Sequence, residues 1–161
     1  MKIRFRARSQ IQNGWFWWSK GTGEQYKQLW RMMFDDFLVR GINNVIWLLP
    51  YSGTPSAAYY PGDEHVDVAG ADTYETNQPF SGLYSATRSI VGETVPIPLH
   101  ETGTIPNPDA MFNNNAAPWV LFSVWCSSDF ISNQGMNPVD AIKHTYHHER
   151  TLNRGDLPSF E

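Results

Sequence analysis

The sequence predicts an α/β fold with a parallel sheet, and three observations support this prediction. First, short and almost wholly apolar runs such as "NNVIWLLP" and "WVLFSVW" recur along the chain, as expected for strands buried on both faces. Second, segments with helical spacing of apolar residues separate these runs, and alternating strands and helices form parallel sheets. Third, polar or aromatic residues follow the strands, and functional groups at C-terminal strand ends are typical of (β/α)8 barrels.

The first expected elements are a strand, a helix and a second strand. In residues 2–8, Lys and Arg alternate with apolar residues, which predicts a strand with one polar face. Residues 24–41 carry apolar side chains at i, i+3, i+4 and i+7, and Gly41 stops the run. This pattern predicts an amphipathic helix. The β-branched run at 43–50 then predicts a buried strand.

The same alternation continues to the end of the chain. For the helix at 137–148, Asn137 is the expected N-cap and Pro138 the first helical residue. Two prolines weaken the strand predicted over 95–101. The chain thus carries about five strands, whereas a complete barrel has eight and needs ~250 residues. We expect one domain over residues 1–161, with further strands at 65–72, 95–101 and 119–125 and further helices at 79–92, 107–115 and 137–148.

Composition excludes several classes of protein. The net charge of −4 argues against nucleic acid as a partner. No apolar run approaches ~20 residues, so we expect no membrane span. The first residues lack an apolar region of the signal-peptide kind, and the localisation stays unassigned. A lone cysteine, Cys126, excludes an internal disulfide and has no recognisable base partner in the sequence.

Aromatic residues make up 14% of the chain, with seven tryptophans. Flat apolar rings with polar edges suit the faces of sugars, so such side chains can line a carbohydrate site. They can equally fill a core, and we favour this second interpretation for most of the tryptophans.

Three residues are candidates for chemistry. Glu101 ends an apolar strand, where a carboxylate could attack an anomeric carbon, although a surface-loop glutamate is an equal alternative. Asp72 and Tyr74 are two residues apart and share a face if the chain is extended. Tyr74 could donate a hydrogen bond to a neighbouring carboxylate and keep it ionised. Taken alone, each of these two is more often structural.

Two histidine-containing stretches favour structural roles. Residues 63–65 (DEH) follow a Pro-Gly turn, and their spacing matches no metal motif. The "HHER" stretch at 147–150 lies at an expected helix end, where cations interact favourably with the helix dipole. We therefore expect no metal site and no organic cofactor.

A set of motifs in fixed order resembles the C-terminal part of glycoside hydrolase family 26. No single motif suffices, but the combination is specific and runs over nearly the whole chain. The family consists mainly of retaining endo-β-1,4-mannanases, with some β-glucanases and β-xylanases, on a (β/α)8 barrel. The resemblance implies a partial (β/α)8 TIM barrel containing about strands 4 to 8 with their helices. It is carried by "NGWFWW", "EQYKQLWRMMFDDFLVRGINNVIWLLP", "YYPGDEHVDVAGADTY", "LHETGTIPNPD", "FSVWCSSDFI" and "RGDLP".

The resemblance also implies roles for individual residues. Glu101 falls on the family's nucleophile at the end of strand 7. Tyr74 falls on the tyrosine that hydrogen-bonds this nucleophile, with Asp72 beside it. Trp125 falls on the tryptophan after strand 8 that forms a platform for the sugar. Trp15, in the aromatic run after strand 4, would lie near the sugar-binding cleft.

One departure from the family pattern affects the acid/base. The family carries Arg-Pro-x-His-Glu ahead of the aromatic run, whereas this chain has "RARSQ" at 6–10. The general acid/base therefore maps onto Gln10 and the histidine before it onto Ser9. A retaining glycosidase needs two carboxyl groups about 5–5.5 Å apart. Gln10 cannot deliver a proton, so we expect impaired turnover of β-mannan or a related polysaccharide.

Two further hypotheses follow from the same sequence. A non-catalytic carbohydrate-binding or scaffold protein would keep the aromatic cleft without the acid. An assembly module would pair with a copy of itself as a homodimer or with a complementing barrel half, because a five-strand fragment leaves sheet edges unpaired.

Overall fold

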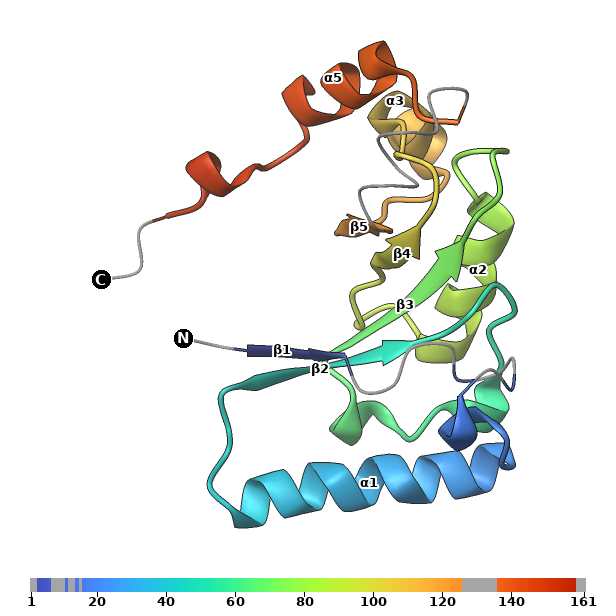
Figure 1. Ribbon diagram of the computed structural model, residues 1–161, viewed down its shortest axis with the longest axis vertical. Helices are drawn as coiled ribbons and strands as arrows, with labels where there is room; N and C mark the ends of the chain where they lie inside the picture. The colour runs from blue at the N-terminus through green and yellow to red at the C-terminus, as the bar shows by residue number, and fades with distance from the viewer. Residues whose placement is uncertain (1–2, 7–10, 12–13, 15, 126–135, 159–161) are drawn as a thin grey trace.

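The computed structural model describes residues 3–6, 11, 14, 16–125 and 136–158, and within them lies one five-stranded parallel sheet with the order β1-β2-β3-β4-β5. The sheet pairs each strand with the next one along the chain, and it curls from β1 to β5 (Figure 1). This arrangement confirms the predicted parallel α/β fold and the partial barrel. The strands are β1 (Ile3–Arg6), β2 (Val45–Pro50), β3 (Val68–Thr73), β4 (Leu99–Thr102) and β5 (Phe122–Val124).

Helices join the strands, as crossovers between parallel strands require. The first two long helices, α1 and α2, lie on the outer side of the curled sheet, and α3 and α5 lie beyond β5 (Figure 1). None of the helices in the described part of the chain is long and apolar enough to cross a membrane. The helices are α1 (Gly23–Val39), α2 (Ser81–Val91), α3 (Pro108–Phe112) and α5 (Val139–His147), with short 3₁₀ turns at Trp17–Ser19, Ala57–Tyr59, Asp63–His65, Asn113–Asn115 and Arg154–Asp156.

The sequence fixes both ends of α1. Thr22 caps the N-terminus, and its side chain and that of Gln25 satisfy each other's backbone N–H groups in a capping box. After the C-terminus, Gly41 adopts a φ of 71°, a conformation that glycine reaches without steric cost. One face of α1 packs its aromatic rings against Trp47 of β2, with centroid separations of 5.6 Å for Trp30 and 5.2 Å for Phe37.

Strand β4 begins later than the sequence predicts, at Leu99 instead of residue 95. The two prolines before it still contribute to the ladder, because the carbonyls of Pro96 and Pro98 accept the N–H groups of Ala69 and Ala71. Proline lacks only the donor, so a proline-containing segment can take part in a sheet as an acceptor.

The predicted N-cap of the last helix is wrong. Helix α5 starts at Val139, with Pro138 at the capping position. Asn137 is fully buried, and its side chain bonds a distant loop instead: Oδ1 accepts the N–H of Ile105, and Nδ2 donates to the carbonyl of Gly103. A long-range pair of hydrogen bonds thus replaces the local cap.

Candidate active site

Glu101 lies inside strand β4 and is 3% exposed. The hydroxyl of Tyr74 donates a hydrogen bond to its Oε1 at 2.8 Å. The surface-loop alternative for Glu101 is therefore wrong. The carboxylate is buried at the C-terminal end of a parallel strand, the edge at which (β/α)8 barrels carry their active sites.

Tyr74 follows β3 directly, and its position depends on Gly103. A Cβ at Gly103 would lie 2.5 Å from Cδ1 of the Tyr74 ring, so only glycine leaves room for the ring there. The N–H of Gly103 also donates to the carbonyl of Thr73, which ties the two strand ends together. Sequence reasoning missed Gly103, because its role depends on a side chain of another strand.

The other two described candidates lie at the same edge. Asp72 is 7% exposed and pairs with Glu101 in the β3–β4 register. Trp125 follows β5, and its backbone N–H donates to the carbonyl of Thr102 at 2.9 Å. The Trp125 side chain remains 48% exposed and is thus accessible to a ligand. The structure therefore brings Glu101, Tyr74, Asp72 and Trp125 to neighbouring strand ends.

The loop after Glu101 is fixed from two directions. Besides the bonds from Asn137, the Thr104 hydroxyl donates to the carbonyl of Glu75. The Gln78 amide donates to the carbonyl of Ile105 at 2.7 Å. These contacts connect the loop after β4 to the loop after β3, so they hold Glu101 and Tyr74 in a constant relation. The sequence carries no local signal for them.

Tyr51 directly follows β2, and its side chain lies in the interior of the fold. Its carbonyl accepts the N–H of Asp72 and lies 2.9 Å from Nε2 of His100. Its side chain is fully buried, and burial raises the pKa of the Tyr51 phenol far above its usual value, with the neighbouring Tyr60 phenol adding to the effect. The phenol is therefore neutral throughout the ordinary pH range.

Three predicted site residues, Ser9, Gln10 and Trp15, lie outside the described residues. Of the carboxyl pair that a retaining glycosidase needs, the described residues hold the candidate nucleophile. The fold and the strand-end carboxylate define the class of protein: a partial (β/α) barrel with its candidate site at the C-terminal edge of the sheet.

Comparison with known proteins narrows this class to one family. The model of glycosyl hydrolase family 26 matches residues 1–156, so the chain belongs to this family.

Individual relatives agree with the family match. The chain is 30% identical to a mannan endo-1,4-β-mannosidase of Thermothelomyces thermophilus, over 99% of this chain and 32% of that protein. A solved β-(1,4)-mannanase of Podospora anserina superposes with a TM-score of 0.82 at 29% identity, over 92% of this chain and 33% of that one. A solved β-mannanase from a symbiotic protist of the termite Reticulitermes speratus, in complex with gluco-manno-oligosaccharide, gives 0.81 at 28% identity, over 94% of this chain and 47% of that one.

These numbers set the extent of the match. The chain spans about a third of the length of the curated mannosidase and between a third and a half of the two solved structures.

Proposed function

We propose that this chain carries the nucleophile side of a retaining β-mannanase site, with Glu101 as the nucleophile and Tyr74 as its positioning partner. The observation that supports it most directly is the 2.8 Å hydrogen bond from the Tyr74 hydroxyl to buried Glu101 at the C-terminal strand edge. Mannan is the favoured substrate over mixed-linkage glucan and xylan, because the relatives described above are mannanases.

The proposed reaction begins at the anomeric carbon. A Glu101 oxygen forms a bond to C1 as the glycosidic C–O bond breaks, and the leaving oxygen takes the electron pair. Tyr74 holds the carboxylate in line for this attack, and exposed Trp125 offers a face for the sugar ring. Asp72 lies opposite Glu101 in the β3–β4 register and contributes a second carboxyl group to the proposed site.

Covalent trapping tests the nucleophile. A 2-deoxy-2-fluoro-β-mannoside with a dinitrophenolate leaving group needs no proton donor, because the phenolate departs as a stable anion. We expect mass spectrometry to find the sugar on the peptide containing Glu101, and no label on Glu101→Gln. A matched control, Glu93→Gln at an exposed position, should keep the label. Label on another residue, or none at all, would contradict the proposal.

The residue at the acid/base position limits the rate at which natural substrates are hydrolysed. Gln10 cannot protonate a sugar leaving group, and general acid–base assistance contributes roughly 10²–10⁴ in rate. We expect the variant Gln10→Glu to raise hydrolysis of β-mannan by about this factor, measured as released reducing ends. Trapping that succeeds without any such gain would show that the nucleophile side alone is assembled.

A second candidate function is carbohydrate binding without turnover. It is favoured by Gln10 in the acid position together with the half-exposed Trp125. Calorimetric titration with manno-oligosaccharides distinguishes the two candidates when combined with trapping. Binding that is lost in Trp125→Ala, without covalent label on Glu101, would favour the binding module.

The proposed site also needs the rest of a barrel. Among the described strands, β1 and β5 each pair with one neighbour only, and open parallel edges recruit further strands. We propose that a second copy of the chain or a complementing barrel half pairs with them. Light scattering on the purified chain should give the mass of a dimer if copies complete each other, whereas the mass of a monomer would contradict pairing between copies and favour the binding module.

A further inference from the structure

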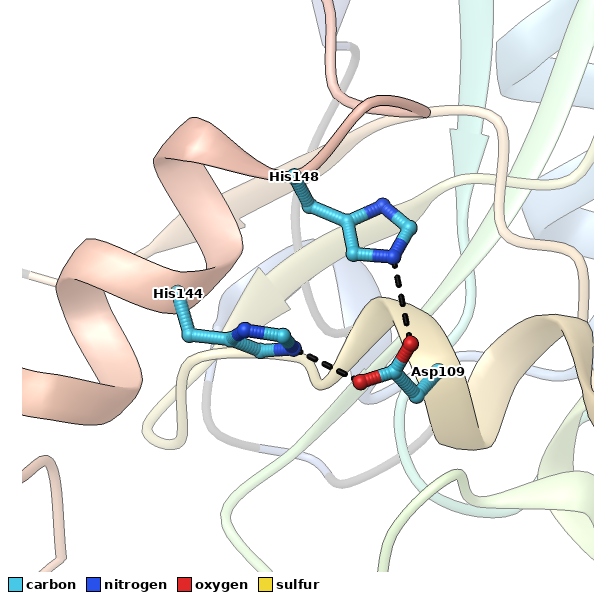
Figure 2. A group of neighbouring side chains, drawn as sticks. All are labelled: Asp109, His144 and His148. Atoms are coloured by element: carbon cyan, nitrogen blue, oxygen red, sulfur yellow. Dashed lines mark hydrogen bonds and ion pairs between the residues drawn. The ribbon is translucent and has the colours of Figure 1, made fainter.

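A second polar cluster lies away from the strand ends, where α3 meets α5. Asp109 of α3 stands between two imidazoles, with its Oδ2 2.7 Å from Nε2 of His144 and its Oδ1 3.2 Å from Nε2 of His148 (Figure 2). One candidate ligand atom from each residue lies within 4.8 Å of the others. We call these three residues the Asp-His-His cluster.

The two histidines share a face because of helical spacing. His144 lies in α5 and His148 caps its C-terminus, four residues later. Residues at i and i+4 are neighbours on a helix surface, and two histidines at this spacing can bind one zinc ion. Both rings point toward the carboxylate of α3 in Figure 2.

The backbone that carries the cluster is held independently of it. The buried Thr145 hydroxyl donates to the carbonyl of Pro106 at 2.7 Å, and Asn137 bonds the same loop. Asn107 caps α3 two residues before Asp109, and its side chain accepts the N–H of Asp109. The three side chains therefore extend from a fixed frame, so little chain entropy is lost when they converge on an ion.

The cluster has the donor set of a transition-metal site. Zn²⁺ binds imidazole nitrogen and carboxylate oxygen at about 2.0–2.2 Å, which in a tetrahedron separates the ligand atoms by about 3.4 Å. The two nitrogen–oxygen distances of 2.7 and 3.2 Å need to open by about 0.7 and about 0.2 Å to reach that spacing. Two imidazole nitrogens disfavour Mg²⁺ and Ca²⁺, which prefer oxygen ligands.

A hydrogen-bonded tether between α3 and α5 is the competing interpretation. The N–H of Arg150 donates to Nδ1 of His148, so the ring proton of neutral His148 lies on Nε2 and points at Asp109. A metal on Nε2 moves this proton to Nδ1, where it faces the Arg150 N–H. Metal binding therefore breaks that one exposed hydrogen bond. The Arg150 N–H loses its acceptor if the cluster binds an ion and keeps it if the cluster is only a tether.

We propose that Asp109, His144 and His148 bind a divalent transition-metal ion of the Zn²⁺ type, with water in the remaining positions, and that the ion links α3 to α5. Asp109 is 65% exposed and His144 is 48% exposed, so an ion can enter from solvent without rearrangement of the core. This site is independent of the proposed sugar chemistry.

Calorimetric titration of the untagged chain with ZnCl₂ tests the proposal. We expect saturable binding of one ion per chain, weakened at least tenfold in His144→Gln, His148→Gln and Asp109→Asn. The matched control is His147→Gln, because His147 is exposed on the same helix and bonds only the carbonyl of Lys143 in the described contacts. It should bind as tightly as the unaltered chain.

Two further readouts distinguish an ion site from the tether. Co²⁺ should give visible absorption bands of a nitrogen- and oxygen-bound ion, absent in His144→Gln, and the Arg150 amide resonance should shift on Zn²⁺ addition. Equal affinity in the unaltered chain and His144→Gln, loss of binding in His147→Gln, or no saturable binding would each overturn the proposal. Competition by millimolar Mg²⁺ would do so as well.

Discussion

Glu101 on β4 and Asp109 on α3 are two carboxylates that meet their partners in opposite surroundings. Glu101 is 3% exposed and lies at a strand end held by bonds between two loops. Asp109 is 65% exposed and meets its two histidines at the solvent-facing contact of two helices. Hydrogen bonding from these imidazoles lowers the pKa of Asp109.

The difference shows what burial contributes to a site. A buried polar group that loses its partner bears its full desolvation cost, whereas an exposed one is solvated again by water. The surroundings of Glu101 therefore tolerate few substitutions, and those of Asp109 tolerate many. The first arrangement suits a group that must keep one orientation, and the second suits one that exchanges protons and ions with solvent.

The largest expected effect is at Asn137. Asn137→Ala leaves the N–H of Ile105 and the carbonyl of Gly103 without their partner inside the fold, at about 1–3 kcal/mol for each buried group. We expect the free energy of unfolding to fall by about 2–6 kcal/mol in urea titration. Exposed Asn113→Ala is the control and should change it little. Equal effects of the two variants would mean that the loop is held by other contacts.

Tyr74→Phe should affect the chemistry more than the stability. It removes the hydroxyl that donates to Glu101, and a hydrogen bond to a charged group contributes about 1.5–3 kcal/mol. We expect the trapping rate with the fluorosugar to fall roughly ten- to hundredfold. In Tyr146→Phe, an exposed position on α5, the rate should not change.

Gly103→Ala tests whether the Tyr74 ring needs the space at Gly103. The added methyl would meet the ring at 2.5 Å, and overpacking of this kind costs about 1–3 kcal/mol. The free energy of unfolding should fall by this amount, and the trapping rate should fall because the Tyr74 ring moves. Gly82→Ala in α2 is the control, because nothing lies within 4 Å of its added Cβ. A Gly103→Ala variant with unchanged trapping would show that Tyr74 is positioned by other contacts.

The smallest expected effect is at His144 in metal-free buffer. His144→Gln removes an exposed contact with Asp109, and exposed ion pairs contribute little to stability. We expect thermal unfolding in chelator to be indistinguishable from that of the unaltered chain. A clear destabilisation would show that the Asp-His-His cluster already supports the fold without an ion.

Much of the fold could be predicted from the sequence. The helical spacing and Gly41 predicted α1, and the β-branched run predicted β2. Both predictions succeeded because the pattern of buried side chains in each element can be seen in its own stretch of sequence. Strand β4 was predicted too long, since its leading prolines accept hydrogen bonds without belonging to the regular strand. Asn137 was assigned to the wrong partner, because a local cap and a distant loop compete for the same side chain.

The candidate site was less accessible to sequence reasoning. Glu101, Asp72 and Tyr74 were candidates from their positions in the sequence, whereas Trp125 and the individual roles came from the family resemblance. The structure brings all four residues to adjacent strand ends. Gly103 depends on a partner from another strand, so no local pattern contains it. His148 was assigned to a helix end within residues 147–150, and the contact that it shares with His144 was missed, although their i, i+4 spacing is a signal that could have found it.

The placement of the tryptophans allows ligand binding to be followed by the intrinsic fluorescence of the protein. Trp30, Trp47 and Trp119 are buried, whereas Trp17 and Trp125 stand in solvent. An aqueous quencher such as iodide should therefore dim only part of the intrinsic fluorescence and leave a blue-shifted remainder. Because Trp125 belongs to the dimmed part and lies at the strand ends, a sugar that covers it would protect its emission, and occupancy could be read without any label.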